Sequence, residues 1–130
     1  MRNYKPTSAS HIDDRLYYRI LGVIRDLPRM KEEADLLLYP SGKGADGQPH
    51  GGGTSDQVAE IASRRERVLA DIAAVEQALA LLPEEYQEAI LRNIVEGVPY
   101  KSLGIYAHDN TLSKRRVEFI TYVGQNLGLL

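Results

Sequence analysis

The sequence feature that most constrains the fold is a row of apolar residues in the second half of the chain, spaced alternately three and four residues apart. Its members, interrupted only by Arg65, are Val58, Ile61, Arg65, Val68, Ile72, Val75, Leu79 and Leu82. These spacings place side chains on one face of an α-helix, and strict alternation is typical of a helix that packs lengthwise on another helix. The sequence therefore predicts a helix over residues 55–82, in which the apolar row alone spans about 25 residues or roughly 37 Å, with Thr54 or Ser55 as its N-cap.

A similar row runs through the first part of the chain. Its members are Ile12, Leu16, Ile20, Val23, Leu27, Met30, Ala34 and Leu37. Ser10 is the expected N-cap. Pro28 lies inside the row, and proline lacks an N–H and clashes with the preceding turn, so a kink is expected over residues 26–28. Because the spacing stays in phase across Pro28, the sequence favours one kinked helix within residues 1–40 over two unrelated helices.

The two rows are separated by residues 41–54, a segment rich in glycine that also contains Pro49. Such a composition predicts a flexible loop. Gly42-Lys43-Gly44 lacks the full Walker pattern and follows no strand, so no phosphate site is expected. Two long helices joined by this loop should form an antiparallel hairpin. A narrow apolar row on so long a helix also favours self-association, so a homo-oligomer is expected.

Residues 83–130 read as a further helical unit. Pro83 followed by two glutamates is typical of a helix start. An apolar face follows at Tyr86, Ala89, Ile90 and Ile94, and Gly97 and Pro99 end the helix. Residues 100–107 then predict a second, short helix.

The break after this short helix comes at residues 108–110, where Asn110 or Asp109 is the expected cap of a last helix. The first turns of that helix are polar and basic, and Gly128 ends it. A short helix, a turn and a helix with polar and basic first turns is the layout of a helix-turn-helix DNA reader. An ordinary three-helix packing unit with a solvated basic turn fits the same spacing.

The net charge of the chain does not favour nonspecific binding along nucleic acid. The net charge is −2, and in residues 81–130 five basic residues face six acidic ones. Any DNA contact must therefore come from a local patch, and three of the five basic residues, Lys114, Arg115 and Arg116, fall within one helical turn. The exposed arginines of the first helix are expected to form a solvated face.

Other classes of protein find little support. The chain has no cysteine, which excludes disulfides and thiolate metal sites, and its three histidines are scattered, so neither a metal nor a cofactor is expected. No catalytic constellation is apparent, so an enzyme is not expected. The chain contains no apolar run long enough to span a membrane and no signal core, so we expect a cytoplasmic protein.

The order of these parts resembles small phage-encoded transcription regulators of the RinA and ArpU type, whose C-terminal halves look like region 4 of sigma factors. The resemblance is carried by residues 18–31, 55–57, 75–79 and 115–129, by Leu82-Pro83-Glu84-Glu85-Tyr86 and by Glu96-Gly97-Val98-Pro99-Tyr100. The chain departs from that pattern at Leu103-Gly104, where the family usually has Ile-Ala, and at the turn, where His108 or Asp109 replaces an apolar residue.

The resemblance implies an all-α fold, a long antiparallel helical hairpin followed by a helix-turn-helix unit. It implies a sequence-specific DNA-binding regulator, a late-gene activator of a phage or prophage in the bacterial cytoplasm, with double-stranded DNA and host RNA polymerase as partners. The DNA-reading residues would be Asn110, Thr111, Ser113, Lys114, Arg115 and Arg116, with Lys101 on a phosphate. Two alternatives remain open: a DNA-recognition subunit like a small terminase, and a helical protein-interaction adaptor that binds no DNA.

Overall fold

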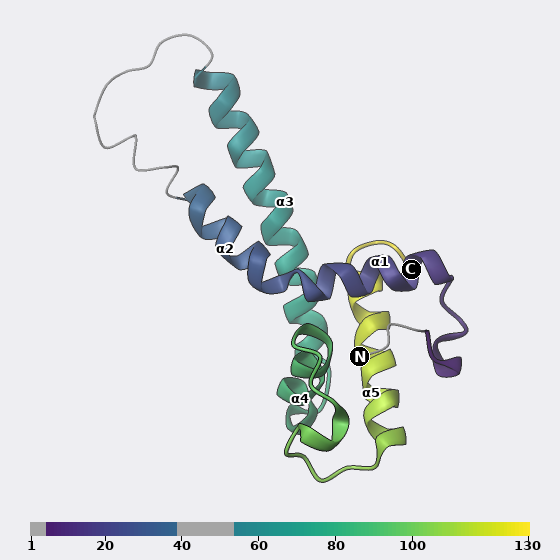
Figure 1. The fold of residues 1–130 in the computed structure, drawn as a ribbon. Helices are drawn as coiled ribbons and strands as arrows, with labels where there is room; N and C mark the ends of the chain where they lie inside the picture. Colours follow the sequence, from purple (N-terminus) through teal and green to yellow (C-terminus); the bar gives the residue numbers. More distant parts are fainter. Residues whose placement is uncertain (1–4, 39–53) are drawn as a thin grey trace.

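The computed structural model describes residues 5–38 and 54–130 of the chain, and every regular element in these ranges is helical (Figure 1). The elements are η1 (Thr7–Ala9), α1 (Asp14–Arg25), α2 (Leu27–Leu38), α3 (Thr54–Ala80), α4 (Glu84–Val95), η3 (Tyr100–Ser102) and α5 (Asp109–Asn126). The all-α prediction is confirmed. Within the same ranges, no helix combines the length and the hydropathy that crossing a membrane requires. The predicted loop 41–54 falls almost entirely outside the described residues.

The predicted first helix is two helices that meet at Asp26. Pro28 has no N–H to give to the preceding turn, but in the first turn of a new helix none is needed. The backbone of Asp26 serves both helices, because its N–H donates to the Gly22 carbonyl at 3.1 Å and its carbonyl accepts from Met30 at 2.9 Å. The cap of α1 is Asp13 rather than the expected Ser10. The chain turns sharply between α1 and α2 (Figure 1).

An ion pair bridges this junction. The guanidinium of Arg29 donates two hydrogen bonds to the Asp26 carboxylate, from Nε at 2.7 Å and from Nη2 at 2.5 Å. Arg29 Nη1 also reaches Glu33 at 3.1 Å. The hydrogen bonds from Arg29 hold the pKa of Asp26 below its ordinary value, against a smaller opposing effect of burial, and they raise the pKa of Arg29.

Among the described residues, the hairpin consists of α2 and α3. These two helices run antiparallel and are tied by an ion pair between Lys31 Nζ and Glu76 Oε2 at 3.0 Å (Figure 1). The expected participation of residues 12–25 is wrong, because the turn at Asp26 sends α1 across α4 and α5 instead. The hairpin and the C-terminal unit are therefore not separate, since α1 belongs to the core of the latter.

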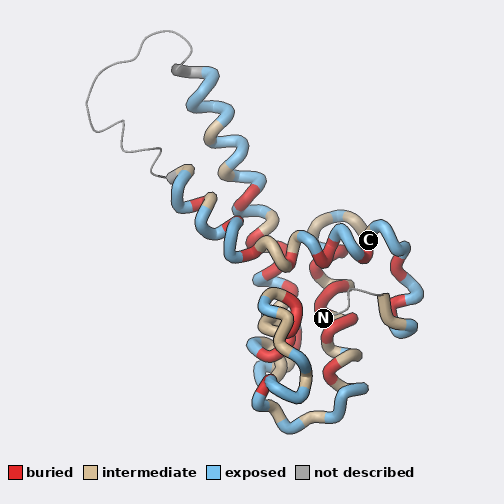
Figure 2. Tube along the Cα trace, viewed as in Figure 1, coloured by how far each residue is buried: buried red, intermediate tan, exposed pale blue. Residues whose placement is uncertain are grey.

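The core lies where α1, α4, α5 and the C-terminal half of α3 meet, and buried residues concentrate there (Figure 2). Its largest fully buried side chains include Tyr17, Ile20, Ile90 and Phe119. At Gly124 of α5 the helices come so close that a Cβ would lie 2.6 Å from Ile20 Cδ1. The predicted apolar rows point inward here, whereas the far end of α3 projects away from the core as an arm.

Candidate nucleic-acid interface

The predicted short helix over residues 100–107 is wrong. Only a single 3-10 turn forms, Tyr100–Ser102, and residues 103–108 are not helical. Gly97 and Gly104 adopt φ angles of +72° and +71°, which favour glycine and interrupt helical structure on both sides of that turn. The side chain of Asn93 fixes the first bend by donating to the Val98 carbonyl at 2.9 Å. The unit is therefore α4, a 3-10 turn and α5, with a long connection where the first reader helix was expected.

That connection directs side chains alternately inward and outward. Leu103 is buried, and Ile105 and Ala107 pack on the core, whereas Tyr106 and His108 are exposed. His108 is also the N-cap of α5, because its Nδ1 accepts from the backbone N–H of Asn110 at 3.0 Å. Asn110 and Asp109, the predicted caps, lie inside the helix. Neither Tyr106 nor His108 was predicted as part of the site, and the alternation of residues 103–108 was the signal that could have found them.

Four predicted DNA-reading residues lie in the first turns of α5. Asn110 and Lys114 are exposed, whereas Thr111 and Ser113 are half-buried. Ser113 Oγ donates to the Tyr100 hydroxyl at 3.3 Å, so its hydroxyl links α5 to the 3-10 turn. Of the predicted DNA-binding residues, Asn110 and Lys114 are therefore exposed on α5, and Lys101 is exposed on η3.

Arg115 is half-buried and its charge is compensated. Its Nη1 lies 2.9 Å from Glu118 Oε2, and its guanidinium stacks over the Tyr86 ring at 5.4 Å from the ring centre. Its Nε is buried without a hydrogen-bond partner among the described residues. In this arrangement Arg115 joins α5 to α4 and offers little positive charge to a ligand.

Arg116 lies in the core, only 6% exposed, so the prediction that it grips the DNA backbone is wrong. Its Nε donates to Asn93 Oδ1 at 3.0 Å and its Nη1 donates to the Tyr17 hydroxyl at 2.9 Å. A buried charge needs such partners, because leaving water without them is costly. The guanidinium thus connects α5, α4 and α1 at the centre of the unit.

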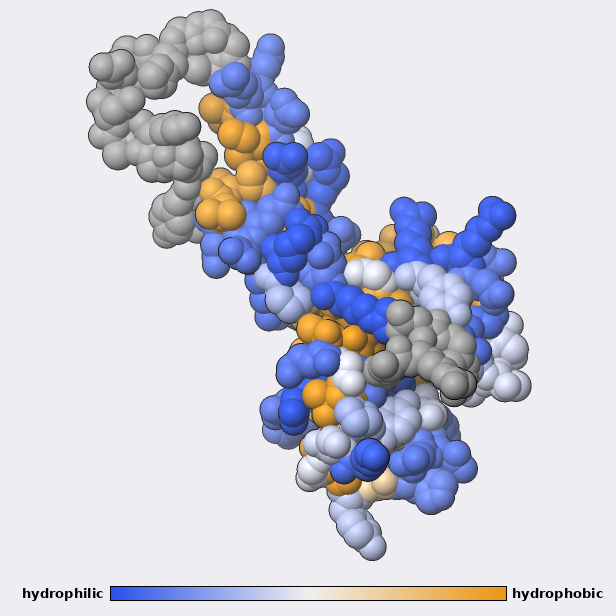
Figure 3. Space-filling view, in the orientation of Figure 1, coloured by the Kyte–Doolittle hydropathy of each residue, from blue (hydrophilic) through white to orange (hydrophobic). Residues whose placement is uncertain are grey.

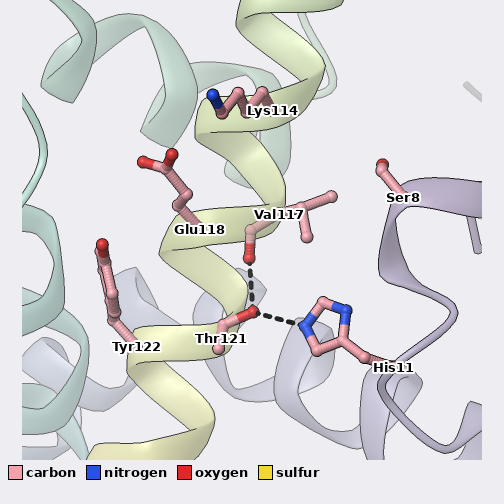
Figure 4. Close-up of a pocket in the computed structure, with 7 residues that line it drawn as sticks. All are labelled: Ser8, His11, Lys114, Val117, Glu118, Thr121 and Tyr122. Carbon is pink, nitrogen blue, oxygen red and sulfur yellow. Dashed lines mark hydrogen bonds between the residues drawn. The ribbon is translucent and has the colours of Figure 1, made fainter.

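A shallow groove of about 230 Å³ runs along α5 beside Lys114 (Figure 4). Its walls come from the N-terminal segment, with Ser8 and His11, and from one face of α5. Thr121 Oγ1 donates to the Val117 carbonyl at 2.8 Å, so it accepts from His11 Nε2 at 3.2 Å. This contact seats the N-terminal segment on α5, next to the predicted DNA-reading turns.

The electrostatic character of the site follows from these placements. Of its predicted cations, Lys101 and Lys114 stay exposed, Arg115 is paired and Arg116 is buried. Asp109 adds a negative charge in the first turn of α5. The N-terminal end of a helix nevertheless carries partial positive charge, which attracts phosphate. Within residues 5–38 and 54–130, no group of three or more potential ligands that could hold a metal ion occurs.

The comparisons with known proteins add no neighbour to this description. No family model matches the chain, and neither the curated proteins nor the solved structures contain a match.

Proposed function

We propose that this chain is a sequence-specific DNA-binding protein that presents the first turns of α5 to the major groove. The observation that carries the proposal is the exposed start of α5. It places Asn110 and Lys114 outward, one helical turn apart, at the positive end of an 18-residue helix. Asparagine can bond adenine with two hydrogen bonds, lysine can bond guanine, and an α-helix fits the major groove.

Residues that flank the start of α5 support the same orientation of this helix on DNA. Lys101, on the 3-10 turn before α5, can bond a phosphate, and the helix end adds a second attraction for the backbone. The exposed Tyr106 and His108 lie on the outward side of the connection into α5 and extend the polar surface. Discrimination by Asn110 and Lys114 is worth roughly 1–3 kcal/mol for each good pair.

In this proposal the protein regulates transcription, in keeping with its resemblance to phage late-gene regulators. It acts in the cytoplasm of a bacterial host, as a homo-oligomer and in contact with host RNA polymerase. Of the four predicted cations of the site only Lys101 and Lys114 are exposed, which implies that recognition depends on base contacts more than on phosphate contacts.

A salt titration tests the phosphate part of this proposal. Each lysine that neutralises one phosphate contributes about −0.9 to the slope of log K against log salt. Lys101→Ala should make the slope less negative by about that amount, whereas Lys114→Ala, which removes a base contact, should change it less. Lys31→Ala is the matched control, because Lys31 is an exposed lysine on α2 that pairs with Glu76. Equal slopes for all three variants would contradict the proposed orientation.

A second candidate function is a protein-interaction adaptor, which one groove favours. A depression of about 480 Å³ lies between the start of α2 and α4, and is lined by Leu27, Pro28, Leu91 and Val95 with charged residues at its edge. It is larger than the groove along α5. A chain that binds no duplex at low salt but binds purified RNA polymerase, and loses that binding on Leu91→Glu, would establish the adaptor.

A further inference from the structure

The two helices of the hairpin differ in length, because α2 (Leu27–Leu38) is less than half as long as α3 (Thr54–Ala80). At the usual helical rise, α2 spans roughly 18 Å and α3 spans roughly 40 Å. Lys31 is level with Glu76, so in antiparallel order the end of α2 comes level with the part of α3 near Leu69. No described helix lies beside residues 54–68.

The apolar row of α3 continues along this uncovered part. Val68 and Ile72 are buried, and Ile61 and Val58 precede them in the same row, which only Arg65 interrupts, with Val58 64% exposed. Apolar side chains are visible on the arm in the space-filling view (Figure 3). A shallow hollow of about 260 Å³ lies beside Ile61. The apolar row of α3 therefore extends beyond the end of α2, the helix that covers the rest of the row.

The charges beside this surface change sign along the helix. Asp56 and Glu60 precede Ile61, and Arg64 and Arg67 follow it. Their spacings of four, four and three keep them on one side of α3, and all four are exposed. Glu60 and Arg64 form two walls of the hollow beside Ile61. This face of α3 is acidic before Ile61 and basic after it. Its charges therefore complement those of the same face on a second, antiparallel α3 helix.

We infer that residues 56–68 of α3 are a docking surface for a second copy of this chain, in which the two α3 helices pair antiparallel about a two-fold axis near Ile61. Ile61 then packs on Ile61 of the other copy, and Glu60 of each copy lies within reach of Arg64 of the other. In a parallel pair the charged sides of the two helices would lie on opposite sides of the dimer, so Glu60 of one copy would not meet Arg64 of the other. The two-fold contact closes on itself and yields a dimer, not a ring.

The dimer sets the separation of the two C-terminal units. Since α3 continues from Ile61 to Ala80 in each copy, the two helix ends lie roughly 57 Å apart at the usual helical rise. The paired segment is short, so the interface falls in the small class. This inference does not depend on DNA binding.

Sedimentation of the full chain over a concentration series tests the inference. The wild type should shift from 14.5 kDa to twice that mass as its concentration rises. Glu60→Arg and Arg64→Glu should each weaken dimerisation about tenfold, because each turns two attractive pairs into repulsive ones. An equimolar mixture of these two variants should restore the dimer, since each copy then supplies the charge that the other lacks. Glu66→Arg, on another face of α3, is the matched control and should dimerise like the wild type.

Restoration by mixing is the decisive result, because a loss of folding in either variant would not be repaired by the other. Circular dichroism of each variant confirms that its helix content is unchanged. A wild type that stays at 14.5 kDa throughout the series would overturn the inference. So would single variants that dimerise normally, or a mixture that stays monomeric.

Discussion

Replacing Arg116 with alanine should destabilise the fold strongly, because Arg116 is a buried residue and not a surface residue. The guanidinium donates to Asn93 at 3.0 Å and to Tyr17 at 2.9 Å, and the side chain is 6% exposed. Hydrogen bonds to a charged group contribute roughly 1.5–3 kcal/mol each, and alanine would leave two buried acceptors without a donor. We therefore expect Arg116→Ala to lower the free energy of unfolding by about 3–5 kcal/mol, a large fraction of the ~5–15 kcal/mol of a typical domain.

Urea unfolding followed by circular dichroism measures this loss, with Lys114→Ala as the control on the same helix. Lys114 is exposed, so its replacement should change the free energy of unfolding by less than about 0.5 kcal/mol. Tyr17→Phe removes one acceptor without changing the packing, and should lower the free energy of unfolding by about 1–2 kcal/mol.

A double-mutant cycle between Tyr17→Phe and Arg116→Ala separates the hydrogen bond from the packing. The coupling free energy should be about 1–2 kcal/mol, because the second replacement removes a contact that the first has already lost. A loss under about 1 kcal/mol for Arg116→Ala, or a coupling near zero, would refute the buried network. It would also return Arg116 to the candidate DNA-binding residues.

Replacements at four further positions probe the ends and contacts of the helices. His108 caps α5, so His108→Ala should lower the free energy of unfolding in urea by about 0.5–1 kcal/mol, whereas His108→Ser should preserve it. The Asp26 side chain is partly exposed in its pair with Arg29. Asp26→Asn should therefore cost only about 0.5–1 kcal/mol at neutral pH. Because folding lowers the pKa of Asp26, this difference should persist above the ordinary value of 3.8 and fade as pH falls below it. Gly124→Ala should cost about 1–3 kcal/mol by crowding Ile20. Gly22→Ala, where a Cβ would meet no nearby atom, should instead raise the melting temperature.

The rows of apolar residues predicted the helices well, because helix periodicity is a local property that burial reinforces. Both rows point inward over most of their length, and α3 runs as one helix. The path of the chain was harder to predict. Spacing that stays in phase across Pro28 is compatible with a kink or with a full break, and the structure has two helices that share the backbone bonds of Asp26. The sequence therefore did not show that α1 packs on α4 and α5.

The candidate site was predicted less well, because charge alone does not tell an exposed arginine from a buried one. Arg116 sits four residues after Leu112 and three before Phe119, so it falls on the apolar face of α5. That phase could have indicated burial, whereas its partners Asn93 and Tyr17 lie 23 and 99 residues away. The failure of the short helix over residues 100–107 has a local cause, since Gly104 adopts a φ of +71°.

Selection of duplexes from a random pool at two salt concentrations, followed by sequencing of the bound fraction, tests the central proposal most directly. We expect one enriched motif for the wild type. Replacing both Asn110 and Lys114 with alanine should relax that motif, whereas Lys31→Ala should retain it. Binding without enrichment at either salt concentration, or an unchanged motif in the double variant, would show that the start of α5 does not read DNA.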